Sequence, residues 1–544
     1  MNVAQVHFRY TSAESTSSLV LYGNSEDCHR CELLPQRPVT CAPENASCLA
    51  LFPNTTYDFS IDGVYPMHLE LRSQDKPVWA AQYQFADLSE YTMQAQELDT
   101  GDVHASIILD HEGSPAAILT VLFVCILVWI GSCFGLFFWK RHLASLRSDD
   151  EDEPSSLMPL LVPADDPAAA ITSSKSRVVS LDVFRGLTIS TMIFVNYGGG
   201  GYWIFNHSTW NGLTIADLVF PWFAWIMGVT MAISFARHQR RHLTSLHVFR
   251  ACACRSLKLF ALGLFLNNGF DLATWRIPGV LQSFGASYFI VSSIVLGGPN
   301  WFVQGMAMAA IVVLQTMLVF FLPVPGCPTG YLGPGGLGDG GLYTNCTGGA
   351  HRAVDVALFG MSHIFQHPTC KPVYVTDGFD PEGFLNWFMV ALTTFLGYSF
   401  GLLMLCQSSW PRKASVVACA GVALLVVGLV ASQARVNDGW IPINKNLWSL
   451  SFVCVTSGLA SLVFAAVYLV VDVFDIWSGA PFLHAGMNAI LLYCGHELLD
   501  GYFPFGFAHD ETSHTATTLS NVLGVVSWLI IARLLHAKKI FVTV

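Results

Sequence analysis

Long apolar runs separated by short polar segments fill the chain from about residue 115 to its end. Most runs have about 17–25 residues, the length that an α-helix needs to cross a hydrocarbon core about 30 Å thick. The pattern predicts eleven membrane-spanning helices, of which the fourth is the shortest. Their expected ranges are 115–139, 186–205, 213–236, 257–270, 279–297, 301–322, 383–406, 414–433, 448–470, 481–499 and 517–536. The sequence therefore predicts a polytopic α-helical membrane protein.

The basic residues orient these helices, because short cytoplasmic loops are enriched in Lys and Arg. The basic clusters between and beside the expected spans all fall on the same side of the membrane. They contain Lys140, Arg141, Arg147, Arg237, Arg240, Arg241, Arg250, Arg255, Lys258, Arg412, Lys413, Lys538 and Lys539. We expect this side to be cytoplasmic, with the N-terminus in the lumen and the C-terminus in the cytoplasm.

The first 112 residues follow another pattern, in which polar and apolar residues alternate, as in "VHFRY" and "TYDFSIDGVYPMHLELRS". A period of two is typical of half-buried β-strands. We expect a small β-rich luminal domain at 1–112 and the first membrane helix at 113–140. A cytoplasmic acidic linker at 141–178 precedes a ten-helix membrane domain at 179–544, which includes a luminal loop at 323–382.

Cysteines and glycosylation sequons agree with this orientation. Four cysteines in the luminal domain predict two disulfides in an oxidising compartment, and two more are expected to close the glycine-rich luminal loop, leaving Cys370 unpaired. The disulfide candidates are Cys28, Cys31, Cys41, Cys48, Cys327 and Cys346. Asn45, Asn54 and Asn345 head N-x-[ST] sequons on the luminal side and are expected to carry glycans. No apolar leader segment is visible in "MNVAQVHFRYTSAESTSS".

Composition and charge narrow the function classes. Hydrophobic residues make up 53% of the chain and charged residues only 12%, which excludes an ordinary soluble domain. A net charge of −11 argues against a nucleic-acid partner. The cysteines in or near the spans lack zinc-site spacing, so no metal site is expected. The linker sequence "SDDEDEPSSLMPLLVPADDP" is either a disordered hinge or an acidic signal for endosomes or lysosomes that ends in Leu160 and Leu161.

Ionisable residues inside a membrane are costly unless they face a cavity or a partner, which makes them functional candidates. Asp182 and Arg185 can pair on one helical face at the cytoplasmic mouth. Asn196 follows Arg185 by three turns and can face the same cavity, before glycines 198–201 end the helix. His207 comes just beyond, and Asp217 lies within the third span. Further polar candidates near span ends are Lys258, Arg276, Gln282, Lys445, Asn446, Trp448, His496 and Glu497.

His207 has two interpretations. Between Trp203 and Trp210 it fits an aromatic belt at the membrane surface, and it also fits a membrane-embedded reaction centre. From the local residues alone, both interpretations stay open.

Several longer motifs occur in order over about residues 178–540. They are "SLDVFRGL", "FVNYGGG", "WNGLTIADLVFPWF", "RIPGVLQ", "LPVPGCPTGYLGPGG", "NCTGGA", "FDPEG", "IPINKNLWSLS" and "GMNAILLYCGHE". Together they resemble the heparan-α-glucosaminide N-acetyltransferase family, whereas the luminal domain is similar to that family only in size and cysteine content. The resemblance implies a lysosomal membrane enzyme that needs no permanent cofactor. Such an enzyme transfers acetyl from cytosolic acetyl-CoA to the terminal glucosamine of heparan sulfate in the lumen.

The resemblance places the family's active histidine on His207 and the neighbouring asparagine on Asn196. His207 is then expected to attack the thioester or to act as general base, with Asn196 as an oxyanion donor and Asp217 orienting the ring. The candidates for acetyl-CoA binding are Asp182, Arg185, Lys258, Arg276, Gln282, Lys445, Asn446 and Trp448, and His496 and Glu497 are further polar candidates. Because Asn206 makes "NHS" a sequon beside the reaction centre, we expect it to stay unmodified.

Two other functions fit the same residues. Intramembrane charges and broken helices also occur in solute transporters, although no internal repeat is visible. A related acyltransferase acting on another glycan is the second alternative. Expected partners besides acetyl-CoA and heparan sulfate are membrane lipid and a second copy of the chain, since the luminal domain is a candidate contact for a homodimer or a substrate.

Overall fold

The computed structural model describes residues 2–12, 18–41, 49–98, 103–113, 178–407, 409–503 and 513–542, together with isolated positions between 123 and 139. Most of the expected first span, most of the acidic linker including Leu160 and Leu161, Asn45 and Cys48 lie outside these residues.

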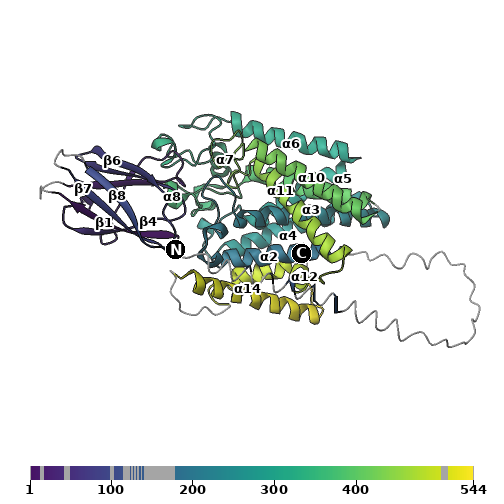
Figure 1. Ribbon diagram of the computed structural model, residues 1–544. Helices are drawn as coiled ribbons and strands as arrows, with labels where there is room; N and C mark the ends of the chain where they lie inside the picture. Colours follow the sequence, from purple (N-terminus) through teal and green to yellow (C-terminus); the bar gives the residue numbers. More distant parts are fainter. Residues whose placement is uncertain are drawn as a thin grey trace, which may run out of the picture.

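The N-terminal domain is a β-sandwich of two four-stranded sheets at one end of the molecule (Figure 1). The strands are β1 (Val3–Thr11), β2 (Val20–Ser25), β3 (Leu34–Pro35), β4 (Thr56–Asp62), β5 (Met67–Ser73), β6 (Lys76–Tyr83), β7 (Glu90–Glu97) and β8 (Val103–His111). One sheet has the order β4-β1-β7-β8, with β1 and β7 parallel, and the other has the order β3-β2-β5-β6. Alternate residues such as Phe8, Leu21, Phe59 and Leu69 are buried between the sheets. The prediction of a small β-rich N-terminal domain is confirmed.

The rest of the described chain is mostly helical. The long helices are α2 (Val179–Asn196), α3 (Ile215–Arg240), α4 (Ser245–Asn267), α5 (Val280–Gly297), α6 (Trp301–Phe321), α9 (Phe384–Cys406), α10 (Trp410–Ala431), α11 (Leu450–Tyr468) and α14 (His514–Ala537). Shorter helices are α7 (Ala350–Phe359), α8 (Lys371–Tyr374), α12 (Phe482–Met487) and α13 (Ala489–Leu498). Among the described residues, eight helices are long and apolar enough to cross a membrane. The class of multi-pass helical membrane protein is confirmed, but the expected number of eleven spans is not.

Two expected spans differ from the structure for visible reasons. The fourth, placed at 257–270, is the second half of α4, which begins at Ser245 and includes three basic residues that we had assigned to a loop. The tenth, placed at 481–499, is broken at Asn488 into α12 and α13, each too short to cross a bilayer alone. The second span also ends earlier than expected, at Asn196, because the glycine run that follows cannot continue the helix.

Backbone contacts between glycines bring α2 close to α12. A Cβ atom on Gly186 would overlap the carbonyl oxygen of Phe482, and one on Gly486 would overlap the carbonyl oxygen of Asp182. Small residues let membrane helices approach in this way, where packing replaces the hydrophobic effect as the main source of association. This contact places the helix that carries Arg185 and Asn196 directly against the broken α12–α13 segment.

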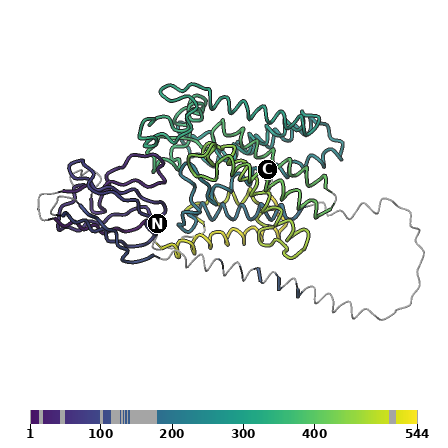
Figure 2. Tube along the Cα trace, turned by 45° about the horizontal axis from the view of Figure 1, so that its top comes forward, coloured from purple at the N-terminus to yellow at the C-terminus, as the bar shows by residue number. Residues whose placement is uncertain are grey.

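The loop between α6 and α9 gathers at the end of the bundle that carries the β-sandwich (Figure 1). Its glycine-rich part is closed by a disulfide between Cys327 and Cys346, as expected, and Cys370 is a buried free thiol. Figure 2 shows α14, in yellow, reaching from the helical bundle to the β-sandwich. The N-terminal domain therefore contacts both the loop and the last helix.

Replacing Gly186 by Ala should lower the thermal unfolding midpoint in detergent. The added methyl group must separate α2 from α12, and such overpacking costs about 1–3 kcal/mol. Gly305 on α6 is the matched control, since a Cβ atom there meets nothing within 4 Å. Gly305→Ala should be neutral or slightly stabilising, because Ala is the better helix former. A midpoint for Gly186→Ala equal to that of Gly305→Ala would contradict the close packing of α2 on α12.

Candidate active site

A cavity of about 700 Å³ lies within the helical bundle, lined by α2, α3, α4, α5, α12 and α13. Its polar lining includes Arg185, Arg255, Asn196, His207 and Lys445. At 1.5 Å per residue, Arg185 and Asn196 are about 17 Å apart along α2. The wall is largely apolar; its lining includes Ile189, Met192, Phe220, Phe223 and Phe284. The size and lining fit a small-molecule substrate with polar groups at its ends.

His207 is placed by the turn that connects α2 to α3. All four residues of the run Gly198–Gly201 have φ between 58° and 110°, a backbone region that glycine adopts without steric cost. The chain then enters α3 through a capping box, in which Thr214 and Asp217 each bond the backbone amide of the other. Asp217 is fully buried, and its Oδ1 lies 2.8 Å from His207 Nδ1. One carboxylate therefore begins the helix and holds the histidine.

The partners of Asp217 fix the tautomer of His207. A carboxylate only accepts, so Nδ1 donates to Asp217 and Nε2 carries the lone pair. The second carboxylate oxygen, Oδ2, accepts from the backbone amides of Ser208 and Thr214, each at 3.2 Å. The side chain of His207 is 35% exposed. Nε2 therefore carries no proton and can accept one, as a base or nucleophile role requires, and the orienting role of Asp217 stays a prediction.

Lys445 completes this group from the loop before α11. Its Nζ lies 3.5 Å from Asp217 Oδ1 and within 3.4 Å of both ring nitrogens of His207. Because Nδ1 already donates to Asp217, the ammonium can act as donor only toward the carboxylate and toward Nε2. Lys445 was expected among the acetyl-CoA ligands, but here it contacts the histidine, 238 residues away in the sequence.

Asn196 contacts the other two expected polar residues. Its Nδ2 lies 2.9 Å from His496 Nε2 and 3.0 Å from Glu497 Oε1. His496 Nδ1 donates to the carbonyl of Leu492, so in the neutral ring Nε2 accepts from Asn196. Both amide hydrogens are then in use. A role for Asn196 as oxyanion donor requires one of them to be released, and the Glu497 side chain, 38% exposed against 2% for His496, is the freer partner.

Two guanidinium groups, those of Arg185 and Arg255, line the cavity. Arg185 donates to Asp182 at 3.1 Å and to the carbonyl of Gly486 at 3.3 Å. Arg255, from α4, lies 4.9 Å from the ring centre of Tyr288. Sequence reasoning missed Arg255 and chose Lys258 instead, which is exposed and does not line the cavity. The signal that could have identified Arg255 is its position one helical turn before Lys258, on the face of α4 that lines the cavity.

Arg276 is bound by carboxylates and so is less available to a ligand than we expected. Its Nε and Nη2 lie 2.9 and 2.7 Å from the two oxygens of Asp380, and Nη2 also pairs with Glu382. Burial alone would lower the pKa of Arg276, but the two carboxylates raise it above its usual range. Arg276 and Glu382 both line the cavity. The bidentate pair between Arg276 and Asp380 fixes the loop that precedes α9.

Three other expected acetyl-CoA ligands lie outside the cavity lining. Gln282 is fully buried against Gly263 and Gly279. Trp448 packs its ring on Phe220 with centres 5.0 Å apart. Asn446 donates to the carbonyls of Thr209 and Trp210, and so supports the segment that carries His207. Asp182 reaches the site only through its pair with Arg185. A direct role of these residues in acetyl-CoA binding stays a prediction.

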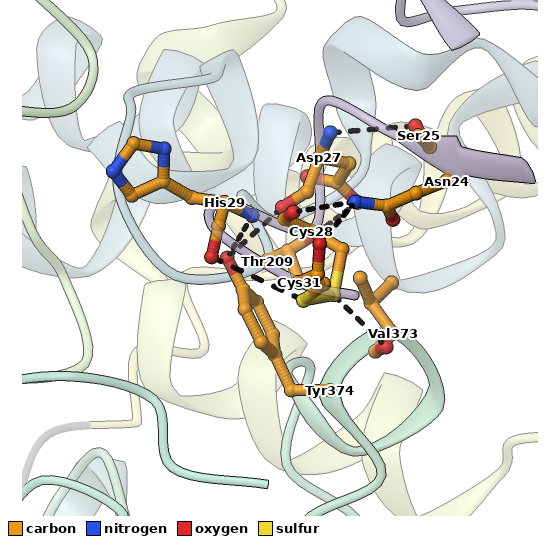
Figure 3. The surroundings of a disulfide bond; sticks show 9 residues. All are labelled: Asn24, Ser25, Asp27, Cys28, His29, Cys31, Thr209, Val373 and Tyr374. Atoms are coloured by element: carbon orange, nitrogen blue, oxygen red, sulfur yellow. Dashed lines mark hydrogen bonds between the residues drawn. A yellow bond between two sulfur atoms is a disulfide. The ribbon is translucent and has the colours of Figure 1, made fainter. Parts of the chain in front are cut away.

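The N-terminal domain touches the same segment two residues after His207 (Figure 3). Thr209 Oγ1 donates to Asp27 at 2.7 Å, next to the disulfide between Cys28 and Cys31. The hydroxyl of Tyr374 donates to the carbonyl of Asp27 and accepts from the amide of His29, each at 3.0 Å. Burial raises the pKa of Asp27, and the bond from Thr209 opposes this. Cys41 is also disulfide-bonded, in keeping with the expected framework.

Comparison with known proteins now decides the family. Residues 177–345 match the family model described as heparan-alpha-glucosaminide N-acetyltransferase, catalytic. Over 96% of its length the chain is 34% identical to heparan-alpha-glucosaminide N-acetyltransferase of Mus musculus and 33% identical to that of Homo sapiens, and each alignment covers 86% of the relative. The chain belongs to the heparan-α-glucosaminide N-acetyltransferase family. The resemblance carried by the motifs is confirmed, and with it membership of a family of acyltransferases.

The matched region of the heparan-α-glucosaminide N-acetyltransferase family contains most of the site. Residues 177–345 include α2, the glycine turn, His207 and Asp217. Lys445, His496 and Glu497 come from later in the chain and join the site only through the fold.

Replacing Asp217 by Asn should lower kcat on the order of 10²–10⁴-fold, the usual range for a lost acid–base contribution, with little change in KM for acetyl-CoA. The amide can still cap α3 through its oxygen, but its NH₂ then donates to His207 Nδ1 and moves the ring proton to Nε2. The control is Asp377→Asn, since Asp377 pairs with Arg352 at the surface and is 63% exposed. Both variants should unfold within a few degrees of the parent. Unchanged turnover in Asp217→Asn would refute the orienting role.

Proposed function

We propose that this protein transfers acetyl from cytosolic acetyl-CoA to the amino group of the terminal non-reducing α-glucosamine of heparan sulfate in the lysosomal lumen. This step would be needed for the degradation of heparan sulfate. The observation that carries the proposal is a single cavity whose lining contains two arginines and a histidine bonded to a buried carboxylate. The names of the mouse and human relatives supply the acceptor sugar.

The two substrates explain why the site must lie inside the membrane. The phosphates of acetyl-CoA cannot enter hydrocarbon, and the sugar polymer cannot leave the lumen. A cavity along α2 lets the phosphates stay near Arg185 and Arg255 while the thin thioester arm extends toward His207. Arginine suits the first task, because its planar fork donates two parallel hydrogen bonds to a phosphate. The apolar middle wall fits the alkyl part of the arm.

His207 would act as the general base in a direct transfer. The amine nitrogen attacks the thioester carbonyl carbon, and Nε2 takes the proton that the amine loses. The carbon–sulfur bond then breaks, and the CoA thiolate receives that proton from the imidazolium. Asp217 holds the ring throughout and stabilises its charged form. Attack by Nε2 itself, with an acetyl-imidazole intermediate, is the second route and needs two transfers instead of one.

Asn196 would act on the thioester oxygen in this reaction, and Glu497 would act on the amine of the sugar. If Asn196 releases Glu497, its free N–H can donate to the thioester oxygen as negative charge develops there. The released carboxylate can then accept a hydrogen bond from the amine of the sugar. Both residues line the cavity together with His207, which is the geometric support for these roles.

The alternatives are separated by one assay. Membranes containing the protein are incubated with labelled acetyl-CoA and glucosamine, and then with competing amino sugars. Label on the sugar excludes simple solute transport, and preference among sugars separates heparan-type acceptors from other glycans. Accumulation of an unmodified solute without acetyl transfer would favour the transporter.

His207→Ala should fold, reach its membrane and bind acetyl-CoA, yet transfer no measurable acetyl group. His207 is partly exposed at the end of the cavity, so its loss should cost little packing energy. His367→Ala is the matched control, because His367 is an exposed luminal histidine outside the cavity lining. In the parent protein without sugar, label retained on the 202–210 peptide under conditions that preserve acetyl-imidazole would replace direct transfer by the covalent route. Turnover at the level of His367→Ala would remove His207 from the mechanism.

Arg185→Ala should raise KM for acetyl-CoA more than it lowers kcat, because the lost contact is to the phosphates and not to the reacting atoms. Arg412→Ala provides the control, as Arg412 is exposed at the start of α10 and does not line the cavity. Equilibrium binding of CoA to both variants shows whether KM reports affinity. A pure loss of kcat in Arg185→Ala, with CoA affinity unchanged, would contradict the role in phosphate binding.

A further inference from the structure

His514 joins three parts of the chain that are far apart in the sequence. It is the first residue of α14, and its side chain is only 4% exposed. Its Nε2 lies 2.9 Å from Asp87 Oδ2, in the turn between β6 and β7 of the luminal domain. Its Nδ1 lies 2.9 Å from the carbonyl oxygen of Gly200, in the glycine turn before His207. One imidazole therefore connects the luminal domain, the last helix and the turn that places the reactive histidine.

Both partners of His514 are acceptors. A backbone carbonyl and a carboxylate cannot donate, whereas a neutral imidazole has a single N–H. The two contacts can therefore be hydrogen bonds at the same time only if the ring carries two protons and a positive charge. The ring of Tyr202 stacks on His514 with centres 4.4 Å apart and planes 17° from parallel, which also favours a cation.

The positive charge on His514 also stabilises the carboxylate of Asp87. The side chain of Asp87 is 12% exposed, and its Oδ1 has no hydrogen-bond partner within the described part of the chain. The N-terminus of a helix disfavours a cation, and the carboxylate of Asp87 offsets this effect at the start of α14. In the described residues, Asp87 and Tyr202 are the titratable groups that face the ring, and Thr518 is the neutral polar residue nearest to Gly200.

The glycine turn depends on such outside contacts. Its four residues have no side chains to pack, and each adopts a positive φ that a flexible chain does not keep by itself. The bond from His514 to Gly200 fixes the turn seven residues before His207. The contact between Asp27 and Thr209 fixes the same segment on its other side. Without the bond from His514 to Gly200, the contact between Asp27 and Thr209 is the remaining one of these two links between the segment and the luminal domain.

We propose that His514 is an acid-dependent positioning residue, which in its protonated form clamps the luminal domain to the turn that places His207. Both hydrogen bonds exist when His514 carries two ring protons, and one of them is lost when His514 loses a proton. The clamp is therefore complete in the protonated form of His514 and weakened in the neutral form. For its effect on turnover the inference rests on the proposed acetyl transfer, but its effect on the turn does not.

Asp87→Asn tests the clamp without removing its geometry. An asparagine can donate through Nδ2 to the lone pair of Nε2 while neutral His514 still donates from Nδ1 to Gly200. Both bonds then survive without a charge, so the variant should lose the pH dependence and keep the clamp. The matched control is Asp58→Asn, because Asp58 pairs with His7 at 2.6 Å on the exposed surface of the same β-sandwich.

The first measurement is hydrogen–deuterium exchange of the full-length protein in detergent, in peptides covering residues 198–206, at pH 5 and pH 8 after correction for intrinsic rates. We expect the parent and Asp58→Asn to exchange about tenfold faster at pH 8, the scale of one lost hydrogen bond to a charged group. Asp87→Asn should exchange equally at both pH values. Equal pH dependence in all three proteins, or fast exchange of Asp87→Asn at both pH values, would overturn the proposal.

The second measurement is the kcat profile for acetyl transfer over the same pH range, expressed as the ratio of Asp87→Asn to the parent. Titration of the substrate amine and of His207 cancels in this ratio, so the ratio should rise toward alkaline pH. A ratio that is flat and below one would show an ion pair that only stabilises the fold. If no protein transfers acetyl, the proposed function fails while the exchange result still decides the clamp.

Discussion

The structure of the site depends on one buried charge, the carboxylate of Asp217. A charge without exposure to water is costly unless every lone pair has a partner, and Asp217 has five polar neighbours within 3.5 Å. The contacts that satisfy this carboxylate begin α3, close the turn after α2 and hold the loop that carries Lys445. The orientation of the His207 ring follows from the same arrangement, because the carboxylate that caps α3 also sets which ring nitrogen carries the proton.

The N-terminal domain takes part in this arrangement more directly than its sequence indicated. Its cysteine-containing turn bonds Thr209, and its turn between β6 and β7 reaches His514. Both contacts flank the segment that carries His207. A domain with no cavity-lining residue of its own thus supports the site from the outside, since the segment between α2 and α3 has little regular structure of its own.

The sequence could predict what depends on local pattern. Hydropathy located most long helices and alternation located the β-domain. The glycine run marked the end of α2, although the apolar pattern extended that span to residue 205. Hydropathy did not predict that α4 continues through its basic residues, because those charges lower the mean hydropathy by which a span is recognised. A single Asn488 breaks α12 from α13 without changing the average polarity of the run. Lys445, Asn446 and Arg255 were assigned to other places because their contacts join segments that the sequence separates by up to hundreds of residues. Such long-range contacts follow from packing, which no local window contains.

The cavity has a consequence for the membrane itself. A cavity wide enough for the arm of a substrate is also wide enough for water, and a continuous column of water across a membrane conducts protons. The side chains of Ile189, Met192, Phe220, Phe223 and Phe284 line the wall of this cavity. Apolar walls of this kind can exclude water and so stop conduction. These apolar side chains would thus limit the leakage of protons through the helical bundle when the cavity holds no substrate.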